Sequence, residues 1–552
     1  MKNNFRCLLL ATALLSTTAV AQFPALVSAI NPTGSSNPGV MTVINNNVYF
    51  AADDGVHGTE LWTSDGTAAG TQLVKDINSG ATGSFPTSLT VYAGKLYFKA
   101  DDGINGNELW VSDGTGPGTH ILKDINSGPS ASNPGSFAVY NGKLYFSADD
   151  GTHGIEMWTS DGTSTGTSLF KDIYPGASGG YPVLFTPYNG KLYFQADDPV
   201  NGYELWVSDG TSAGTQILKD INSGPSDSNP AAFYVFNGKL YFCASTPAAG
   251  RELWVTDGTS AGTTLLMDIN PGINSSFPLF YTAYNSRMYF AADDGTNGKE
   301  LWVTDGTPGG TSMLKDLNPG SSDGSPGGMT VYNGKLYFNA NDNTNGAELW
   351  VSDGTSAGTA LLKDIFAGSG SANPFDFTIY HDKLYFQASA DAVNGRQLFV
   401  TDGTDTGIHY LAPAVAPNYH PLLSTPGDGL RTCNGLLFFA ANFDANNQQL
   451  YKLETSGVGV PVVVGNHMQA ALFPNPATGS VQLTFTLTQA SSVTIDLYDV
   501  AGRRIQSWAG SSSLAAGDHK QELVLPSGIA GGSYYLHIVA AGEASVLKLD
   551  VQ

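Results

Sequence analysis

The chain has 552 residues, with 48 Asp and Glu against 25 Lys and Arg, and a net charge of −23. Nucleic-acid-binding surfaces are basic, so this charge argues against DNA or RNA as a partner. Gly is abundant at 66 residues, aromatic residues make up 11% and charged residues only 13%. This composition is typical of a turn-rich all-β protein and excludes a disordered chain, which would lack the aromatic residues.

Residues 1–21 have the pattern of a secretory signal peptide. Lys2 and Arg6 precede an apolar run, and Ala19-Val20-Ala21 is a small-residue cleavage site. Cys7 lies before the apolar run, so it is not the cysteine of a lipoprotein signal. No later stretch approaches the roughly 18 apolar residues of a membrane span. We therefore expect a secreted protein with no transmembrane segment.

A repeat of 48 residues organises most of the chain. Its best-preserved part is Glu60-Leu61-Trp62-Thr63-Ser64-Asp65-Gly66-Thr67, and weaker copies follow at Gln397-Leu398-Phe399 and Gln449-Leu450-Tyr451. The repeated tryptophans are Trp62, Trp110, Trp158, Trp206, Trp254, Trp302 and Trp350. A fixed period of about 40–50 residues is typical of propellers and solenoids. Nine units of one kind can therefore form a single body.

Each unit contains four short runs with the composition of strands, here called a, b, c and d. In the second unit they cover 89–92, 95–100, 108–112 and 119–125. Pairs such as Asn141-Gly142 supply the positive φ angles of a two-residue a–b hairpin. The b–c loop contains Asp-Asp-Gly, the c–d loop Asp-Gly-Thr, and a longer link rich in Ser, Gly and Pro leads to the next unit. Three hairpins and one crossover describe a propeller blade.

The two ends of the repeat region predict how the ring closes. Residues 26–30 resemble a strand d with no a, b or c before it, and the ninth unit's own candidate, 460–464, contains Pro461. We therefore predict that the N-terminal strand lies beside Gln449-Leu450-Tyr451 and completes a nine-bladed β-propeller over residues 22–465. Eight blades with a stray hairpin, or an open solenoid, are the alternatives.

Packing between blades is the expected role of the repeated tryptophans, and a ring of exposed, sugar-stacking indoles is the alternative. The Asp of Asp-Gly-Thr is expected to shape the c–d turn by accepting hydrogen bonds from amides two residues on, while the next Gly takes a positive φ. These residues are Asp65, Asp113, Asp161, Asp209, Asp257, Asp305 and Asp353. Asp-box turns of some propeller hydrolases are similar in placement, but the spacing differs and implies no activity here.

Counting across the c–d loop places Glu60 opposite Lys75. Such a cross-strand ion pair contributes a few tenths to about 1 kcal/mol. The same count gives the pairs Glu108–Lys123, Glu156–Lys171, Glu204–Lys219, Glu300–Lys315 and Glu348–Lys363, whereas Glu252 meets Met267.

The Asp pairs of the b–c loops are expected on one rim of the propeller, because b–c loops and d–a crossovers share an edge. They are Asp53, Asp54, Asp101, Asp102, Asp149, Asp150, Asp197, Asp198, Asp293 and Asp294. Turn formation is the main interpretation. A weak Ca²⁺ site, or a ligand-binding rim, is the alternative, because clustered oxygens on loops suit calcium. The spacing matches no known calcium loop, so no metal ligand is firmly assigned.

No Ser/His/Asp, Cys/His or His-Glu-x-x-His arrangement appears, so no catalytic residue is assigned. His57 and His153 occupy the same loop position two units apart. After signal cleavage only Cys243 and Cys433 remain. Free thiols are expected, and a disulfide between them is the alternative.

The regularity of Glu-Leu-Trp-x-x-Asp-Gly-Thr over about residues 26–454 resembles the family of secreted bacterial proteins named for this motif. Only Met157 replaces the Leu in the seven full copies. That family is known by its repeat, so the resemblance implies no activity.

Residues 466–552 differ from the repeats and have alternating strand patterns, which predict a small antiparallel β-sandwich. Pro474-Asn475-Pro476, Gly479, Gly532, Tyr534 and Lys548 make this segment similar to the C-terminal sorting domain of type IX secretion substrates in Gram-negative bacteria. The resemblance implies transit through the periplasm, recognition by the type IX machinery and release or anchoring at the outer surface. We therefore expect a secreted or surface-bound, non-enzymatic protein that binds a glycan or a protein. A calcium-stabilised structural or adhesion propeller is the second hypothesis, and a glycan-active enzyme is the third.

Overall fold

A computed structural model describes residues 22–392, 396–411, 429–441, 447–455, 470–487, 490–499, 504–509, 514–540 and 543–552. The candidate signal peptide and the segment 460–464 lie outside these residues. The described part is almost entirely β-structure, with one short 3₁₀ turn, η1 (Pro308–Gly310). It divides into two compact units, Pro24–Leu453 and a second unit that contains Glu454–Gln552.

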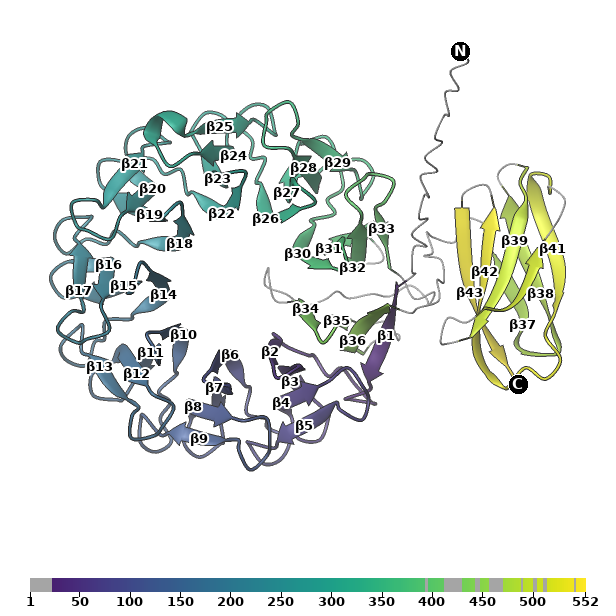
Figure 1. The fold of residues 1–552 in the computed structure, drawn as a ribbon, viewed down its shortest axis with the longest axis horizontal. Helices are drawn as coiled ribbons and strands as arrows, with labels where there is room; N and C mark the ends of the chain where they lie inside the picture. The colour runs from purple at the N-terminus through teal and green to yellow at the C-terminus, as the bar shows by residue number, and fades with distance from the viewer. Residues whose placement is uncertain are drawn as a thin grey trace, which may run out of the picture. The chain divides into compact units, whose positions relative to one another are not determined.

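The first unit is a propeller of nine four-stranded sheets, which Figure 1 shows as a ring with strand a of each blade innermost. This confirms the nine-bladed prediction over the eight-bladed one. The first four blades contain β2 (Thr42–Ile44), β3 (Asn47–Asp53), β4 (Thr59–Ser64), β5 (Gln72–Lys75); β6 (Thr87–Tyr92), β7 (Lys95–Asp101), β8 (Asn107–Ser112), β9 (His120–Lys123); β10 (Gly135–Tyr140), β11 (Lys143–Asp149), β12 (Ile155–Ser160), β13 (Ser168–Lys171); and β14 (Val183–Tyr188), β15 (Lys191–Asp198), β16 (Gly202–Ser208), β17 (Gln216–Lys219).

Blades five to nine follow the same order along the chain. They contain β18 (Ala231–Phe236), β19 (Lys239–Thr246), β20 (Gly250–Thr256), β21 (Thr264–Met267); β22 (Leu279–Tyr284), β23 (Arg287–Asp293), β24 (Lys299–Thr304), β25 (Ser312–Lys315); β26 (Gly327–Tyr332), β27 (Lys335–Asn341), β28 (Ala347–Ser352), β29 (Ala360–Lys363); β30 (Phe375–Tyr380), β31 (Lys383–Ser389), β32 (Arg396–Thr401), β33 (His409–Tyr410); and β34 (Leu430–Cys433), β35 (Leu436–Ala441), β36 (Gln449–Thr455), β1 (Gln22–Ser28).

The ring closes in the ninth blade, where β1 lies beside β36 as its fourth strand. The Asn31 amide and the side-chain oxygen of Gln449 add a hydrogen bond of 3.3 Å beside this junction. Val27, Phe438 and Leu450 of the ninth blade pack with Phe50 and Trp62 of the first blade in one buried cluster. The predicted closure by the N-terminal strand is therefore confirmed.

Apolar side chains between neighbouring blades form the core of the propeller. Between the first two blades, Tyr49, Leu61 and Val74 pack against Phe98 and Trp110. In the six blades whose strand a ends in a tyrosine, its hydroxyl donates to a carbonyl of the a–b turn of the next blade, as Tyr92 does to Gly142 at 2.7 Å. Each sheet is thus buried on both faces, which explains why its central strands are apolar on both sides.

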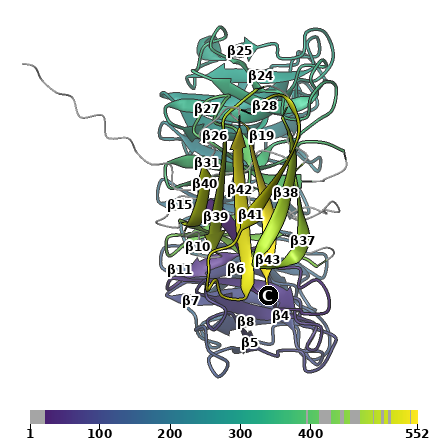
Figure 2. The ribbon, with the colours of Figure 1, turned by 90° about the vertical axis from the view of Figure 1, so that its right-hand side faces the viewer.

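The second unit contains β37 (Ala471–Thr478), β38 (Ser480–Leu487), β39 (Val493–Asp499), β40 (Arg504–Ala509), β41 (Gly517–Val524), β42 (Gly532–Ala540) and β43 (Glu543–Val551). Hydrogen bonding joins these strands, labelled in Figure 2, in the order β40-β39-β42-β43-β37-β38-β41. Leu483 and Phe485 of β38 share a buried core with Ile495 and Leu536 of β39 and β42, so the strands enclose a sandwich core. One pairing departs from the antiparallel prediction, because β37 runs parallel to β43.

The sorting-motif residues lie mainly on β37 and at the turn that follows it. Pro474, Asn475 and Pro476 are exposed, and they separate the part of β37 that pairs with β38 from the part that pairs with β43. Gly479 has φ 82° in the tight turn to β38, a conformation that favours glycine. Gly532 begins β42, and the buried Tyr534 donates to the Ala530 carbonyl at 2.9 Å. Lys548 lies on β43 opposite Tyr535.

Candidate functional site

The candidate site is the rim formed by the b–c loops and the d–a crossovers. Each crossover passes over the start of strand c in one blade and the end of strand b in the next. Between the first two blades, the Phe85 amide donates to the Thr59 carbonyl and the Asp101 amide donates to the Ser84 carbonyl, both at 3.0 Å. The Asp pairs and the crossovers are therefore direct neighbours.

The Glu of each repeat lies beneath this rim and is fully buried, which corrects the prediction of a partly exposed Glu–Lys pair. Glu60 pairs across β3 and β4 with Ala52, and Lys75 lies opposite Leu61. A β-bulge between Leu61 and Trp62 inserts one extra residue and shifts the register beyond it. Ser64 and Thr71, on the loop side of the bulge, do face each other, with their hydroxyls 2.7 Å apart.

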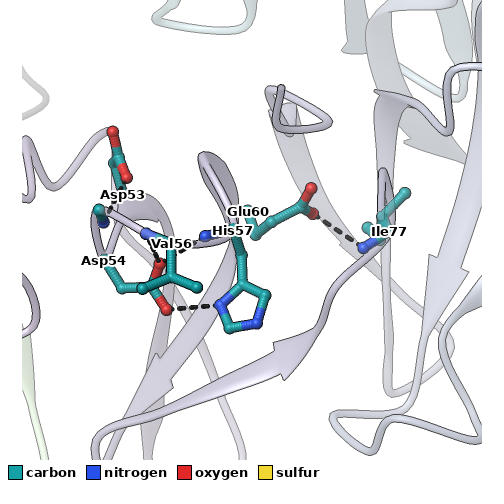
Figure 3. A network of polar contacts seen from close by, with 7 residues as sticks. Asp53, Asp54, Val56, His57, Glu60 and Ile77 are labelled. Atoms are coloured by element: carbon teal, nitrogen blue, oxygen red, sulfur yellow. Dashed lines mark hydrogen bonds and ion pairs between the residues drawn. The ribbon is translucent and has the colours of Figure 1, made fainter. Parts of the chain in front are cut away.

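The Glu60 carboxylate instead ties the crossover to strand c (Figure 3). It accepts hydrogen bonds from the Ile77 amide at 3.0 Å, which Figure 3 shows, from the Asn78 amide at 3.1 Å and from the Ser84 hydroxyl at 2.5 Å. The same buried position and amide partners recur in Glu108, Glu156, Glu204, Glu252, Glu300 and Glu348. This repeated acid therefore holds the loop framework of the rim.

Burial raises the pKa of these glutamates, although the hydrogen bonds that they accept oppose the shift. The pKa is raised to about 7 for Glu156, Glu252, Glu300 and Glu348. Desolvation penalises the charged carboxylate, and nearby Asp172, Asp316 and Asp364 add like charge to Glu156, Glu300 and Glu348.

The lysines predicted as partners of these glutamates link neighbouring blades instead. The Lys75 ammonium donates to the Thr119 carbonyl of the next blade at 2.8 Å and lies 6.0 Å from the centre of the Trp110 ring. Lys219 reaches the Thr263 carbonyl in the same way, also at 2.8 Å. Among the described residues, the one Lys–carboxylate ion pair is Lys363 with Asp405.

Each Asp pair shapes its own b–c loop. Asp53 accepts from the Gly55 amide at 2.7 Å, and one oxygen of Asp54 accepts from the Val56 and His57 amides. The second Asp54 oxygen lies 2.7 Å from His57 Nδ1 (Figure 3). Asp150 has the same contacts with His153, while Asp102, Asp198 and Asp294 bind an Asn at that position.

These contacts occupy both oxygens of the second Asp in each pair. The amides and His57 hold the pKa of Asp54 below its usual value despite its partial burial. In the described part of the chain, no group of three or more His, Cys, Asp and Glu side chains has the arrangement of a metal site. The geometry is that of an Asx turn closed by its own backbone.

One pair differs, because Pro199 follows Asp197-Asp198 where the other loops have Gly. Asp101, Asp149 and Asp293 each accept from that glycine amide at 2.7 Å. Proline has no N–H. No described residue donates a hydrogen bond to the Asp197 side chain.

The Asp of Asp-Gly-Thr lies in the c–d turns at the opposite edge of the blades. Asp65 accepts from the Thr67 amide at 2.8 Å and from the Thr67 hydroxyl at 2.7 Å, and Gly66 has φ 93°. A side chain at Gly70 would place its Cβ 2.1 Å from Asp65 Oδ1, so the turn requires this second glycine. The same bonds occur at Asp113, Asp161, Asp209, Asp257, Asp305 and Asp353.

All seven repeated tryptophans are buried between blades, with 4–9% of their surface exposed. They form no ring of sugar-stacking indoles. Their Nε1 atoms have no hydrogen-bond partner among the described residues, which is uncommon for a buried indole N–H. Cys243 and Cys433 are buried free thiols rather than a disulfide.

The exposed aromatic residues of the rim were missed from the sequence. Phe85, Tyr181 and Phe277 occupy the residue before proline in three d–a crossovers. The only sign of them in the sequence is the residue before a repeated proline. In eight units this residue is Asn, Ser or an aromatic residue.

Comparison with family models identifies the C-terminal unit. Residues 471–552 match the secretion system C-terminal sorting domain. The match supports export by the type IX secretion system to the cell surface or the extracellular space. No helix in the described part of the chain is long and apolar enough to span a membrane.

The other comparisons concern the fold alone. No curated protein matches the chain. A puromycin hydrolase aligns with 14% identity and a TM-score of 0.33, over 66% of this chain and 61% of its own. Oligopeptidase B from Leishmania major aligns with 13% identity and a TM-score of 0.36, over 65% and 53%. Sqt1 from Saccharomyces cerevisiae aligns with 11% identity and a TM-score of 0.32, over 80% and 97%. The chain spans less than two thirds of the length of the two hydrolytic enzymes.

Proposed function

We propose that this protein is a non-enzymatic binding module of a Gram-negative bacterium, delivered to the cell surface or the medium by its C-terminal sorting domain. The match of residues 471–552 to that domain carries the proposal of delivery. The propeller is then the exported cargo, and its rim is the surface offered to a glycan or a protein.

The hydrogen-bonding of the rim supports binding rather than catalysis. A hydrolase that uses carboxylates needs groups free to exchange protons with a substrate. The second Asp of each pair is engaged with its own loop through contacts such as those of Asp54, and the repeated glutamates such as Glu60 are buried beneath the crossovers. These acids stabilise the loops and present no pair of free carboxylates.

Incubation of the purified, full-length protein with surface polysaccharides and extracellular proteins tests this function. We expect saturable binding to one of them, without release of reducing ends or peptides during long incubation. Hydrolysis of a glycan or a peptide by the purified protein would contradict the proposal, provided that an unrelated protein purified in the same way shows none.

A further inference from the structure

The residue before proline has a positive φ in all eight d–a crossovers between 37 and 373. Five of these residues are small and polar: Asn37 (φ 45°), Asn133 (47°), Asn229 (48°), Ser325 (46°) and Asn373 (48°). The other three are aromatic: Phe85 (49°), Tyr181 (46°) and Phe277 (47°). We call these three the rim aromatics; they occur in the second, fourth and sixth blades.

An aromatic residue in this conformation lowers the stability of the fold. Asn tolerates positive φ, whereas a bulky side chain costs about 1–2 kcal/mol there. These residues are only partly buried, because Phe85, Tyr181 and Phe277 are 56%, 42% and 49% exposed. The backbone is held on both sides, since the Tyr181 amide donates to Ile155 and the Gly180 carbonyl accepts from Asp197. A costly conformation that the surroundings enforce is typical of a functional position.

The surroundings of Tyr181 differ from those of the other two rim aromatics at two positions, Asp197 and Tyr203. Asp197 follows Ala196 at the end of β15 and pairs across the sheet with Tyr203 of β16. Side chains of such cross-strand partners lie on the same face of the sheet. Asp197 is the first residue of its Asp pair, a position that in the other pairs accepts a hydrogen bond from a glycine amide. Pro199 removes that donor, so the Asp197 carboxylate is available to accept hydrogen bonds from a ligand.

Tyr203 completes this group. Its amide donates to Asp227 Oδ1 at 3.0 Å, and no other unit has a tyrosine directly before the repeated acid or its Gln counterpart. Burial, followed by the charge of Asp197 and the hydroxyl of Tyr181, raises the pKa of Tyr203, as expected for three neighbouring side chains. Gln195 and Asn229 add an amide–amide hydrogen bond of 3.2 Å on the same rim.

We propose that Tyr181, Asp197 and Tyr203 form a site for a neutral sugar of a glycan, with Phe85 and Phe277 as further stacking positions along the rim. The apolar face of a pyranose ring fits an exposed aromatic ring, and its hydroxyls can donate to the acceptor-only carboxylate of Asp197. The carboxylates of Asp197, Asp198 and Asp227 disfavour an anionic sugar.

The spacing of the rim aromatics favours a glycan over a protein. Asn133 and Asn229 occupy the intervening crossovers, so a polar residue stands between successive rim aromatics. Protein partners bind contiguous patches, whereas separate rings can each stack on one unit of a long polymer. This inference rests on the proposed binding function and names its ligand class.

Calorimetric titration of the full-length protein tests the site, with cellohexaose, mannohexaose and N-acetylchitohexaose as neutral probes and a heparin hexasaccharide as the anionic probe. We compare Tyr181→Asn and Asp197→Asn with the matched control Asp209→Asn, which lies in the c–d turn at the opposite edge of the same blade and accepts from Thr211. We expect one neutral probe to bind, and both site variants to weaken it about tenfold or more. The control should bind as the unmodified protein does.

The melting temperature separates a ligand role from a structural one. We expect Tyr181→Asn to leave it unchanged or to raise it, because Asn suits the positive φ. A lower melting temperature would make Tyr181 a structural residue and overturn the inference, as would neutral-sugar binding that neither site variant weakens. Binding of the anionic probe alone, or of no probe, would also overturn it, while the proposed binding function would still be judged by its own assay with extracellular proteins.

Discussion

Glu60 accepts a hydrogen bond of 3.0 Å from the Ile77 amide, 17 residues further along the chain. This contact joins the start of strand c in one blade to the start of the crossover that leads to the next blade. Six more blades carry the same arrangement, so the acid that looks like half of an ion pair is a buried support for the rim.

The buried glutamate should matter far more than the lysine once assigned to it. Glu156 accepts from the amides of Ile173, Tyr174 and Gly180, and a Gln side chain would turn an N–H₂ group toward some of these donors. We expect Glu156→Gln to destabilise the propeller by about 2–4 kcal/mol. Lys171→Met in the same blade should cost less than about 1 kcal/mol. Urea unfolding of both variants measures the two losses of stability. Equal losses would support an ion pair between Glu156 and Lys171.

Stability should fall as pH rises from 5 to 8. Glu156, Glu252, Glu300 and Glu348 have a pKa raised to about 7 in the folded protein, against an ordinary value of 4.5. The folded state therefore holds more protons than the unfolded state in this window, and stability present below pH 4.5 is lost as pH rises through about 7. Each pKa unit is worth about 1.4 kcal/mol.

Urea unfolding at pH 5, 6, 7 and 8 checks this dependence, and Glu300→Gln should make it shallower. The pKa values of Asp65 and its equivalents are lowered, so these groups change the stability only below about pH 4 and not between pH 5 and 8. Stability that rises between pH 5 and 8 would show that these glutamates are ionised in the folded protein at all four values.

The two glycines of one c–d turn should respond differently to alanine. A Cβ at Gly310 would lie 2.1 Å from Asp305 Oδ1, which already accepts two hydrogen bonds from Thr307, whereas a Cβ at Gly309 meets nothing within 4 Å. We expect Gly310→Ala to cost about 1–3 kcal/mol and Gly309→Ala to be near neutral. Thermal melts of the two variants make the comparison, which fails if both are equally tolerated.

Calcium should leave the melting temperature of the protein unchanged at constant ionic strength. Both oxygens of Asp54 and of its equivalents are held by their own loops, so a cation would have to displace these hydrogen bonds. Ligands that bind only the folded state raise the melting temperature. A melting temperature that rises with added Ca²⁺, but not in Asp54→Asn and the equivalent variants, would show that the Asp pairs bind the cation.

Removal of residues 466–552 should leave the protein in the periplasm. The sorting domain occupies 471–552, while the propeller has its own core and its own closing strand. Fractionation of cells that express the truncated chain measures its location, and circular dichroism of the purified product shows whether the propeller is folded. Secretion of the truncated chain at normal levels would remove the role assigned to this domain.

The sequence predicted the architecture well, because the tryptophan period and the unpaired strand at 26–30 reflect constraints that every blade shares. It could not predict the position of Glu60, since one bulged residue near Val74 shifts the register without any mark in the sequence. The partners of Glu60 are mostly backbone amides, which no residue type reveals. The rim aromatics were hidden for a related reason, because Phe85 signals nothing unusual until its φ of 49° is known.

The closing strand has a consequence for biogenesis. Asn31 and Gln449, bonded to each other, are 418 residues apart, so the ring cannot be completed until nearly the whole propeller has been synthesised. Contacts of such long range form slowly. Because β1 begins at Gln22, directly after the candidate cleavage site, a signal sequence bound to the export apparatus would hold this strand away from β36. If residues 1–21 act as the signal peptide that the sequence predicts, we expect the ring to stay open during export and to close only after cleavage.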